Sequence, residues 1–342
     1  MKPETYKAAI YRGIGSVEVV ELPYPECGDD DIIVRNLESP VCGSDANALV
    51  YGGDPSRIWK DHEFGHEMVS EVVEIGKNVT GLEIGDHVFP NMDKAKRDRN
   101  RVSTVGGFSE YVFIPQCEVG YSVIKIPNDI PIKAAALLEP FVIGTRGAKH
   151  LNPGPGKTAT VFGAGAIGLS AAIMLKWYGC DQVMIVDVSE KRLQLAADLG
   201  LITCNSAKED LKAKAIETFG GTPGLAGEAS TCDLYIDAVG VQAILDSFQQ
   251  IAKPTATLGI VGVYHEPATL NFVLLCYSTW TITGCGRSTL EELVPDILAM
   301  MQSGQYDITT LISHEYKIDD IVDALTMARN SDEALKVAIK YV

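Results

Sequence analysis

The sequence lacks the features of a membrane-spanning or secreted protein. None of its 342 residues belongs to an uncharged apolar stretch of about 18 residues, which excludes a transmembrane helix. The opening segment, MKPETYKAAIYRG, has no apolar run of the kind found in signal peptides. Cysteines number eight, few for this length, and none forms a C-x-x-C pair. We therefore expect free thiols and a cytoplasmic protein.

Positive charge is also scarce. Lys and Arg total 29 against 45 Asp and Glu, which gives a net charge of −16. Since nucleic acids are bound by cationic surfaces, the composition argues against a nucleic-acid partner. Hydrophobic residues make up 46% and charged residues 22%, an ordinary globular composition, and the length predicts about two domains.

The first part of the chain, up to about residue 150, has the pattern of a β-rich domain. Several short runs alternate polar and apolar residues, which is typical of half-buried strands. These runs are YKAAIYRG (6–13), SVEVVEL (16–22), DIIVRNL (31–37), EMVSEVVEIG (67–76), GDHVFP (85–90) and FSEYVFIP (108–115). We expect antiparallel, barrel-like β structure here.

Beyond the Pro/Gly-rich segment LNPGPGKT (151–158), strand patterns alternate with helical ones. This rhythm predicts an α/β domain with a doubly wound parallel sheet, over residues 151–287. After about residue 288, two amphipathic helices (291–304 and 319–330) and a final strand (335–342) break the rhythm. We infer that this tail packs on the first domain, which would then comprise 1–150 and 288–342.

A glycine motif opens the second domain. Gly163, Gly165 and Gly168 spell GAGAIG directly after an apolar strand and at the start of a helix, the pattern of a dinucleotide-binding turn. The next strand ends at Asp187, whose carboxylate can accept a hydrogen bond from a ribose 2′-hydroxyl and would repel a 2′-phosphate. We therefore expect NAD rather than NADP. Lys191 and Arg192, one turn further on, either contact the adenosine or lie on a solvated helix face.

Three short motifs in the first domain contain ligands that zinc prefers. They are Cys42 in VCGSD, His66 and Glu67 in FGHEM, and Glu139 in LLEPF. The carboxylate of Glu139 lies within an apolar run, where it must be protonated, paired or bound to a metal. Together these residues predict a catalytic zinc site.

His62 to His66 also reads HEFGH, which matches the H-E-x-x-H pattern of zinc peptidases. That pattern needs a helix to place both histidines on one face. Here a glycine interrupts it and a strand-like run follows, so a peptidase is a remote alternative.

These residues resemble the zinc-dependent medium-chain alcohol and polyol dehydrogenases. The matching motifs are VCGSD, GHE followed by VSEVVEIGKNVTGLEIGDHVF, GGFSEYV, LLEP, GAGAIG, VDVSEKRL and DLYIDAVG, in the family's order over nearly the whole chain. LLEP is similar to the sorbitol, threonine and butanediol dehydrogenase branch. The resemblance implies a GroES-like catalytic domain, a Rossmann domain, and a homodimer or homotetramer.

The resemblance also implies residue roles. Cys42 and His66 would bind zinc, completed by Glu67, Glu139 or both in alternation, and Ser44 would hydrogen-bond the reacting hydroxyl. The implied cofactor contacts are Ile167 and Gly168 at the pyrophosphate, Asp187 and Arg192 at the adenosine ribose, and Val261, Gly262, Val263, Cys285 and Gly286 at the nicotinamide. Tyr51, Trp59, Phe108 and Arg287 are guesses for the substrate pocket.

Two departures from the family pattern stand out. The family commonly carries four zinc-binding cysteines after GDHVF, whereas this chain has none in PNMDKAKRDRNRVSTVGG, so we expect one catalytic zinc and no structural zinc. The motif CGSDxH usually ends in a histidine that relays a proton, and here Asn47 stands in that position. The proton would then leave from Ser44 through a ribose hydroxyl and water, or through Glu139 or another group.

The segment that replaces the cysteines is basic. It holds Lys94, Lys96, Arg97, Arg99 and Arg101. These cations either pair with acidic neighbours in a solvated loop or form a cationic rim that favours a phosphorylated or carboxylated polyol.

The sequence therefore predicts an NAD-dependent zinc dehydrogenase that oxidises a secondary alcohol within a polyol, sugar alcohol or sugar acid. A zinc-free quinone reductase or crystallin-like NAD(P)-binding protein is the alternative of a different class.

Overall fold

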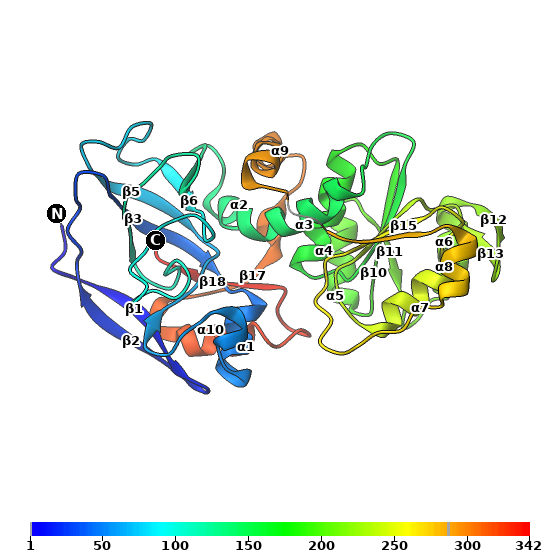
Figure 1. The fold of residues 1–342 in the computed structure, drawn as a ribbon, viewed down its shortest axis with the longest axis horizontal. Helices are drawn as coiled ribbons and strands as arrows, with labels where there is room; N and C mark the ends of the chain where they lie inside the picture. Colours follow the sequence, from blue (N-terminus) through cyan, green and yellow to red (C-terminus); the bar gives the residue numbers. More distant parts are fainter. Residues whose placement is uncertain (1, 286–287) are drawn as a thin grey trace. The chain divides into compact units, whose positions relative to one another are not determined.

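The computed structural model describes residues 2–285 and 288–342. The chain forms two compact units, Met1–Glu139 with Ile308–Val342, and Pro140–Asp307. Figure 1 follows the chain through both units by colour. No helix within the described ranges is long and apolar enough to cross a lipid bilayer.

The first unit is built mainly from antiparallel strands. One sheet has the order β2-β1-β4, and a larger sheet has the order β17-β18-β3-β5-β6-β8, with β7 also pairing with β3. β17 and β18 pair in parallel, and the other pairs are antiparallel. The strands are β1 (Thr5–Gly13), β2 (Ser16–Pro23), β3 (Ile32–Pro40), β4 (His62–Glu63), β5 (Val69–Ile75), β6 (His87–Pro90), β7 (Tyr111–Ile114), β8 (Val123–Ile126), β17 (Ile312–Tyr316) and β18 (Lys336–Lys340).

Short helices close the core of this unit. α1 (Gly43–Tyr51) begins directly after Cys42, and its capping box includes a hydrogen bond from the Cys42 backbone N–H to the Asp45 carboxylate at 3.1 Å. α1 packs against α10 (Ile321–Met327), and Figure 1 shows the two side by side. Both contribute to one apolar cluster that includes the fully buried rings of Phe64 and Phe108. α2 (Ile132–Ala136) and the 3-10 turns η1 (Asp54–Ser56), η2 (Ile308–Leu311) and η3 (Ile318–Asp320) complete the unit.

The second unit contains the predicted parallel sheet, in the order β11-β10-β9-β14-β15-β16. The strand order runs outward in opposite directions from β9 and β14, and ligands of such sheets bind at the carboxyl ends of the strands at this reversal. The strands are β9 (Thr158–Phe162), β10 (Gln182–Asp187), β11 (Ile202–Asn205), β14 (Leu234–Asp237), β15 (Thr257–Ile260) and β16 (Thr281–Gly284). The predicted fold class, a GroES-like β-rich domain plus a Rossmann domain, is confirmed.

The helices of this unit follow from apolar spacing. In α7, for example, Leu245, Phe248 and Ile251 recur at helical intervals, and all three are buried in the apolar core. The helices are α3 (Leu138–His150), α4 (Ala166–Trp177), α5 (Glu190–Asp198), α6 (Leu211–Phe219), α7 (Gln242–Ile251), α8 (Phe272–Ser278) and α9 (Leu290–Ser303). The sequence did not predict α8 or the hairpin of β12 (Gly221–Gly224) and β13 (Gly227–Ser230).

The division between the units differs from the expected boundaries at residues 150 and 288. Most of α3 and all of α9 belong to the second unit, and the returning tail starts at Ile308. Side-chain contacts explain this. The Lys149 ammonium of α3 binds the Asp296 carboxylate of α9 at 2.9 Å, and the Tyr178 hydroxyl donates to the same carboxylate at 2.7 Å.

Candidate metal and cofactor sites

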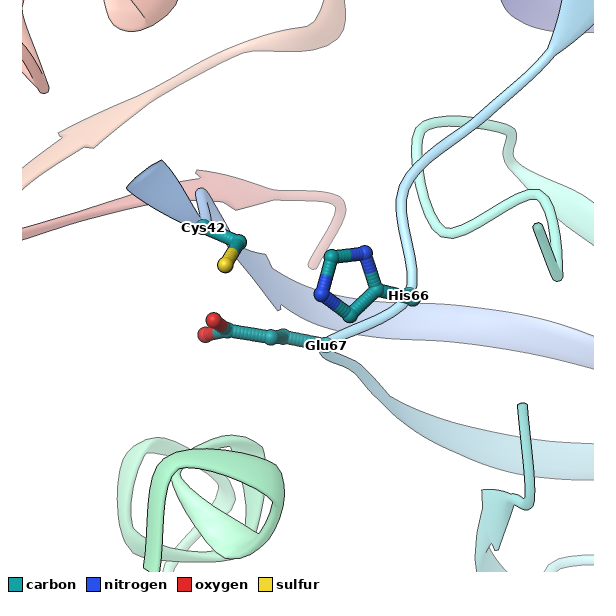
Figure 2. A group of neighbouring side chains, drawn as sticks. All are labelled: Cys42, His66 and Glu67. Atoms are coloured by element: carbon teal, nitrogen blue, oxygen red, sulfur yellow. The ribbon is translucent and has the colours of Figure 1, made fainter. Parts of the chain in front are cut away.

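Three of the predicted zinc ligands meet in the first unit. Cys42 precedes α1, whereas His66 and Glu67 lie between β4 and β5. One possible ligand atom from each of the three lies within 4.8 Å of the other two. Figure 2 shows the sulfur, the imidazole and the carboxylate pointing toward one common space. A thiolate, an imidazole and a carboxylate suit zinc, so the residues present fit a catalytic zinc ion.

Asp45 lies behind His66. Its Oδ1 is 3.5 Å from the His66 Nδ1, while its Oδ2 accepts the Cys42 backbone N–H. Burial lowers the pKa of His66, but the charges of Asp45 and Cys42 outweigh burial and raise the pKa well above its ordinary value. The negative charges that raise the pKa of His66 would also favour a metal cation at this position. Metal-binding histidines commonly have such a carboxylate on the other ring nitrogen. Asp45 was not predicted from the sequence, although its place three residues after Cys42 marks a capping box.

Lys336, from β18, is the second residue that the sequence analysis missed. Its Nζ lies 2.7 Å from Oε1 and 2.6 Å from Oε2 of Glu67, and both side chains are buried. Burial lowers the pKa of Lys336, but the charges of Glu67 and Cys42 outweigh it and raise the pKa above its ordinary value. A buried ammonium therefore balances part of the negative charge at the three-residue group. No local sequence signal marks it, because it lies far along the chain.

Glu139 lies in the first turn of α3 and outside the three-residue group defined among the described residues. Burial and the negative charge of Glu67 raise the pKa of Glu139 to about 7, while His66 and Lys336 act in the opposite direction. Glu139 is therefore within electrostatic reach of the group. Of the two carboxylates that the sequence left open, Glu67 is the one that lies beside Cys42 and His66.

Ser44 and Asn47 lie three residues apart on α1, so they share one side of the helix. Ser44 is partly buried and Asn47 is exposed. An amide such as Asn47 does not act as a base near neutral pH. The role of Ser44 stays a prediction.

The HEFGH segment is not helical. His62 and Glu63 form strand β4, and Gly65 has a positive φ of 91°. The Glu63 carboxylate accepts a hydrogen bond from the Ser109 hydroxyl at 2.7 Å instead of facing a metal ligand pair. The zinc peptidase alternative is wrong, because the two histidines do not lie on one helical face.

In the second unit, the glycine motif connects β9 to α4. Gly163 has a φ of 96°, and a Cβ added to Gly168 would lie 1.8 Å from the Gly163 carbonyl oxygen. Gly165, in contrast, has no heavy atom within 4 Å of the position of an added Cβ. The first and third glycines therefore allow the turn and the close packing of helix on strand, while Gly165 leaves open space at the helix N-terminus where a pyrophosphate can approach.

Asp187 ends β10 beside this turn. Its Oδ2 accepts the Ala164 backbone N–H at 2.6 Å, and its Oδ1 accepts the N–H groups of Val188 and Ser189 at 2.8 and 2.9 Å. An ionised carboxylate has about four acceptor positions, so capacity for a ribose hydroxyl remains. Ser189 is the N-cap of α5, which carries Arg192.

Four of the remaining predicted cofactor residues follow the ends of β15 and β16. Val261 and Gly262 donate their N–H groups to the Asp237 carbonyl, and the Val263 side chain is largely exposed. Cys285 follows β16, and its N–H bonds to the Ile260 carbonyl. Ile167 lies in the first turn of α4. Gly286, like Arg287, lies outside the described residues.

Two family models match the chain. Residues 28–128 match the alcohol dehydrogenase GroES-like domain, and residues 166–303 match the zinc-binding dehydrogenase model. Together they span more than half of the chain, one on each unit. The chain belongs to the zinc-dependent medium-chain dehydrogenases.

The relatives of this dehydrogenase are consistent with that family assignment. L-threonine 3-dehydrogenase of Shewanella woodyi is 28% identical over 346 residues, covering 94% of this chain and 96% of the relative. The structure of 2R,3R-butanediol dehydrogenase from Bacillus subtilis has a TM-score of 0.82 at 23% identity, covering 98% of this chain and 100% of the other. Galactitol-1-phosphate dehydrogenase from Escherichia coli has a TM-score of 0.81 at 23% identity, with the same coverage. Together with the family models, these matches support an oxidoreductase that uses zinc and a nicotinamide cofactor.

One guess for the substrate pocket of this dehydrogenase is wrong. The Phe108 ring is fully buried and packs edge-on against Phe64, with 5.0 Å between ring centroids. The Phe108 N–H also bonds to the Phe64 carbonyl at 3.0 Å, so Phe108 supports the segment before His66 and exposes no surface to a substrate. Tyr51 and Trp59 are exposed.

Proposed function

We propose that this dehydrogenase oxidises a secondary alcohol to a ketone, with NAD as the hydride acceptor and one zinc ion per chain. The observation that carries this proposal is the group formed by Cys42, His66 and Glu67 in the first unit. The open glycine turn at Gly165 and the carboxylate of Asp187 in the second unit support it. The comparisons do not favour the zinc-free reductase alternative.

The chain's own residues would act as follows. Cys42, His66 and Glu67 would hold the metal, and Glu139, which interacts electrostatically with Glu67 and His66, is the alternative carboxylate ligand. When bound, zinc supplies Lewis-acid polarisation of the substrate hydroxyl, and NAD takes up the hydride. Ser44 would take the substrate hydroxyl proton while releasing its own hydroxyl proton to water or to Glu139, since an amide such as Asn47 does not act as a base near neutral pH.

NAD is the proposed cofactor because Asp187 puts a negative charge where the adenosine ribose is expected. That charge is fixed by three backbone N–H groups, so it cannot turn away to admit a 2′-phosphate. The same proposal includes cofactor contacts of seven further residues, which are Ile167, Gly168, Arg192, Val261, Gly262, Val263 and Cys285. A homo-oligomeric assembly and a cytoplasmic location stay predictions.

The proposed substrate is a polyol, sugar alcohol or sugar acid. The names of two relatives support an alcohol that also carries an anionic group, since threonine has a carboxylate and galactitol 1-phosphate has a phosphate, whereas the butanediol of the third relative is neutral. The exposed Arg99 of the basic segment at residues 94–101 supports an anionic group.

A cofactor-dependent screen tests the proposal. Protein purified without chelators would be given secondary alcohols and polyols with NAD or NADP, and the absorbance of the reduced nicotinamide would be followed. We expect oxidation of at least one secondary alcohol, faster with NAD. A preference for NADP would refute the assigned role of Asp187, and reduction of quinones without alcohol oxidation would refute the proposed reaction.

A further inference from the structure

Most cations of the basic segment have partners within the described part of the chain. The Arg97 guanidinium, which is partly buried, donates to backbone carbonyls of Ser103 at 3.2 Å, Met92 at 3.4 Å and Ala95 at 3.5 Å. A planar fork of donors is suited to several carbonyls at once. Three further pairs are Lys94 over the Tyr121 ring, Lys96 with Gln116, and Arg101 with Glu63. These four cations therefore stabilise the segment itself.

Three neighbouring cations differ from these. Arg57, Lys60 and Arg99 are exposed, and none has a hydrogen bond or ion pair from its side chain to any described residue. We call these three residues the cationic patch. A chain with 45 acidic residues offers many partners, yet it leaves the patch without one. Unpaired like charges that lie close together are unfavourable unless an anion offsets them.

Contacts of the His62 ring bring two members of the patch, Lys60 and Arg99, close together. The His62 ring lies between two carbonyl oxygens, that of Lys60 at 2.7 Å and that of Arg99 at 3.1 Å. Burial, together with the positive charges of Arg99 and Arg57, lowers the pKa of the Arg97 guanidinium, and Asp93 acts in the opposite direction. Arg57 and Arg99 therefore both lie within electrostatic reach of the partly buried Arg97.

Arg57 is also held in an uncommon backbone conformation. Its φ is +57°, in the left-handed region, where a non-glycine residue of this kind costs about 1–2 kcal/mol. Its N–H closes the turn η1 on the Asp54 carbonyl at 3.1 Å. The fold thus fixes the direction of this side chain, which is consistent with a binding role.

The patch borders the segment that carries the metal ligands. The Ser103 hydroxyl accepts the Trp59 backbone N–H at 2.9 Å, and the Ser103 N–H bonds to the Glu63 carbonyl at 2.9 Å. The next residue, Thr104, donates its hydroxyl to the Gly65 carbonyl at 2.7 Å. Gly65 directly precedes His66. Residues 103 and 104 therefore connect the cationic patch to the ligand segment within one unit, through two side-chain hydroxyls and one backbone N–H.

We propose that Arg57 and Arg99, supported by Lys60, bind the anionic group, a phosphate or a carboxylate, of the alcohol substrate. This inference rests on the proposed function and names the substrate class. Guanidinium groups bind both kinds of anion through paired hydrogen bonds. The patch would hold the far end of the substrate and would leave its hydroxyl free to reach the metal ligands.

A binding experiment tests the patch without turnover. Trp59 is 36% exposed and lies between Arg57 and Lys60 in sequence, so its fluorescence reports on the patch. Its signal is obtained by subtracting that of the Trp59→Phe protein. Iodide, an anionic quencher, should quench Trp59 about fivefold more strongly in the wild-type protein than in the Arg57→Asn/Arg99→Gln variant. Neutral acrylamide should quench Trp59 equally in both proteins. Asn tolerates the left-handed conformation of Arg57. The control is Lys77→Gln, which removes an exposed cation paired with Asp29.

Protection from iodide then identifies the anion. Inorganic phosphate and acetate are titrated separately, and the one that protects Trp59 at lower concentration identifies a phosphate or a carboxylate as the bound group. Equal quenching by iodide in the wild-type and variant proteins, or no protection by either anion, would overturn the inference.

Turnover gives the second readout. With galactitol 1-phosphate and galactitol as a matched pair, the double variant should lose about tenfold in kcat/KM for the phosphate ester, mostly through KM, and little for the neutral polyol. L-threonine replaces the ester if acetate is the better protecting anion. Equal losses on charged and neutral substrates would refute the inference while leaving the dehydrogenase intact. Anion binding by a protein that oxidises no alcohol would instead refute the proposed function alone.

Discussion

The ammonium of Lys336 lies 2.6 Å from one oxygen of Glu67 and 2.7 Å from the other, and both side chains are more than nine-tenths buried. They are 269 positions apart in the sequence, so the returning tail of the first unit supplies the cation for a carboxylate at the metal-ligand group. Without the Lys336 ammonium, the buried negative charge of Glu67 beside Cys42 and His66 would be costly.

The first prediction concerns this pair. Lys336→Met removes the ammonium but keeps the length of the side chain, and it leaves the Glu67 carboxylate buried without a counterion. We expect the free energy of unfolding of the metal-stripped protein to fall by about 3–5 kcal/mol. In a Glu67→Gln background the same change should cost far less. Urea unfolding of the four proteins measures this coupling, and strictly additive losses would contradict the assigned pairing.

The second prediction concerns Arg97, whose guanidinium holds the segment that replaces the family's cysteine-rich lobe. Arg97→Lys keeps the charge but cannot reach three carbonyls, so it should destabilise the protein almost as much as Arg97→Met, by about 1–3 kcal/mol. Both variants should be cleaved faster by a protease between residues 91 and 103. Arg99→Met, which removes an exposed cation without a side-chain partner among the described residues, is the matched control. Full stability in Arg97→Lys would show that only the charge matters.

The third prediction is a pH dependence at Glu38. This side chain is 2% exposed, and burial, with a smaller effect of the Glu315 charge, raises its pKa to about 7. The folded protein therefore holds this proton more tightly than the unfolded chain, and stability falls as the pH rises between the ordinary value of 4.5 and about 7. Glu38→Gln should gain up to about 3 kcal/mol at a pH of about 8 and nothing at about pH 4. An equal difference from wild type at both pH values would contradict the raised pKa.

The fourth prediction separates packing from cofactor binding in the glycine turn. Gly165→Ala meets open space, so its thermal unfolding should change little, whereas NAD binding should weaken by about tenfold or more because the methyl group occupies the approach to the helix N-terminus. Gly168→Ala should destabilise the second unit, since its Cβ would overlap the Gly163 carbonyl. Gly154→Ala, another open position, is the control. Calorimetry and NAD titration distinguish the two effects.

The sequence predicted the features that depend on local pattern. Alternating strands and helices marked the parallel sheet, and the spacing of Gly163, Gly165 and Gly168 marked the turn, because backbone geometry is determined by neighbouring residues. The ligand candidates Cys42, His66 and Glu67 were recognisable by side-chain type and motif.

Features that depend on tertiary contacts were not predictable in this way. Lys336 reaches Glu67 only because β18 pairs with β3, which ends beside Cys42. The same applies to α9, which has an ordinary amphipathic sequence but belongs to the second unit through Lys149 and Asp296. Of the cations in residues 94–101, sequence alone could not show that Arg97 is turned toward backbone carbonyls while Arg99 stays free of partners within the described residues.

The most direct test of the account is the zinc content per chain, measured by elemental analysis of protein purified without chelators. We predict about one zinc per chain, lost in Cys42→Ala while NAD binding is retained, since one group of ligands fits a catalytic ion. Two zinc ions per chain, or a metal-free protein that oxidises alcohols at full rate, would contradict it.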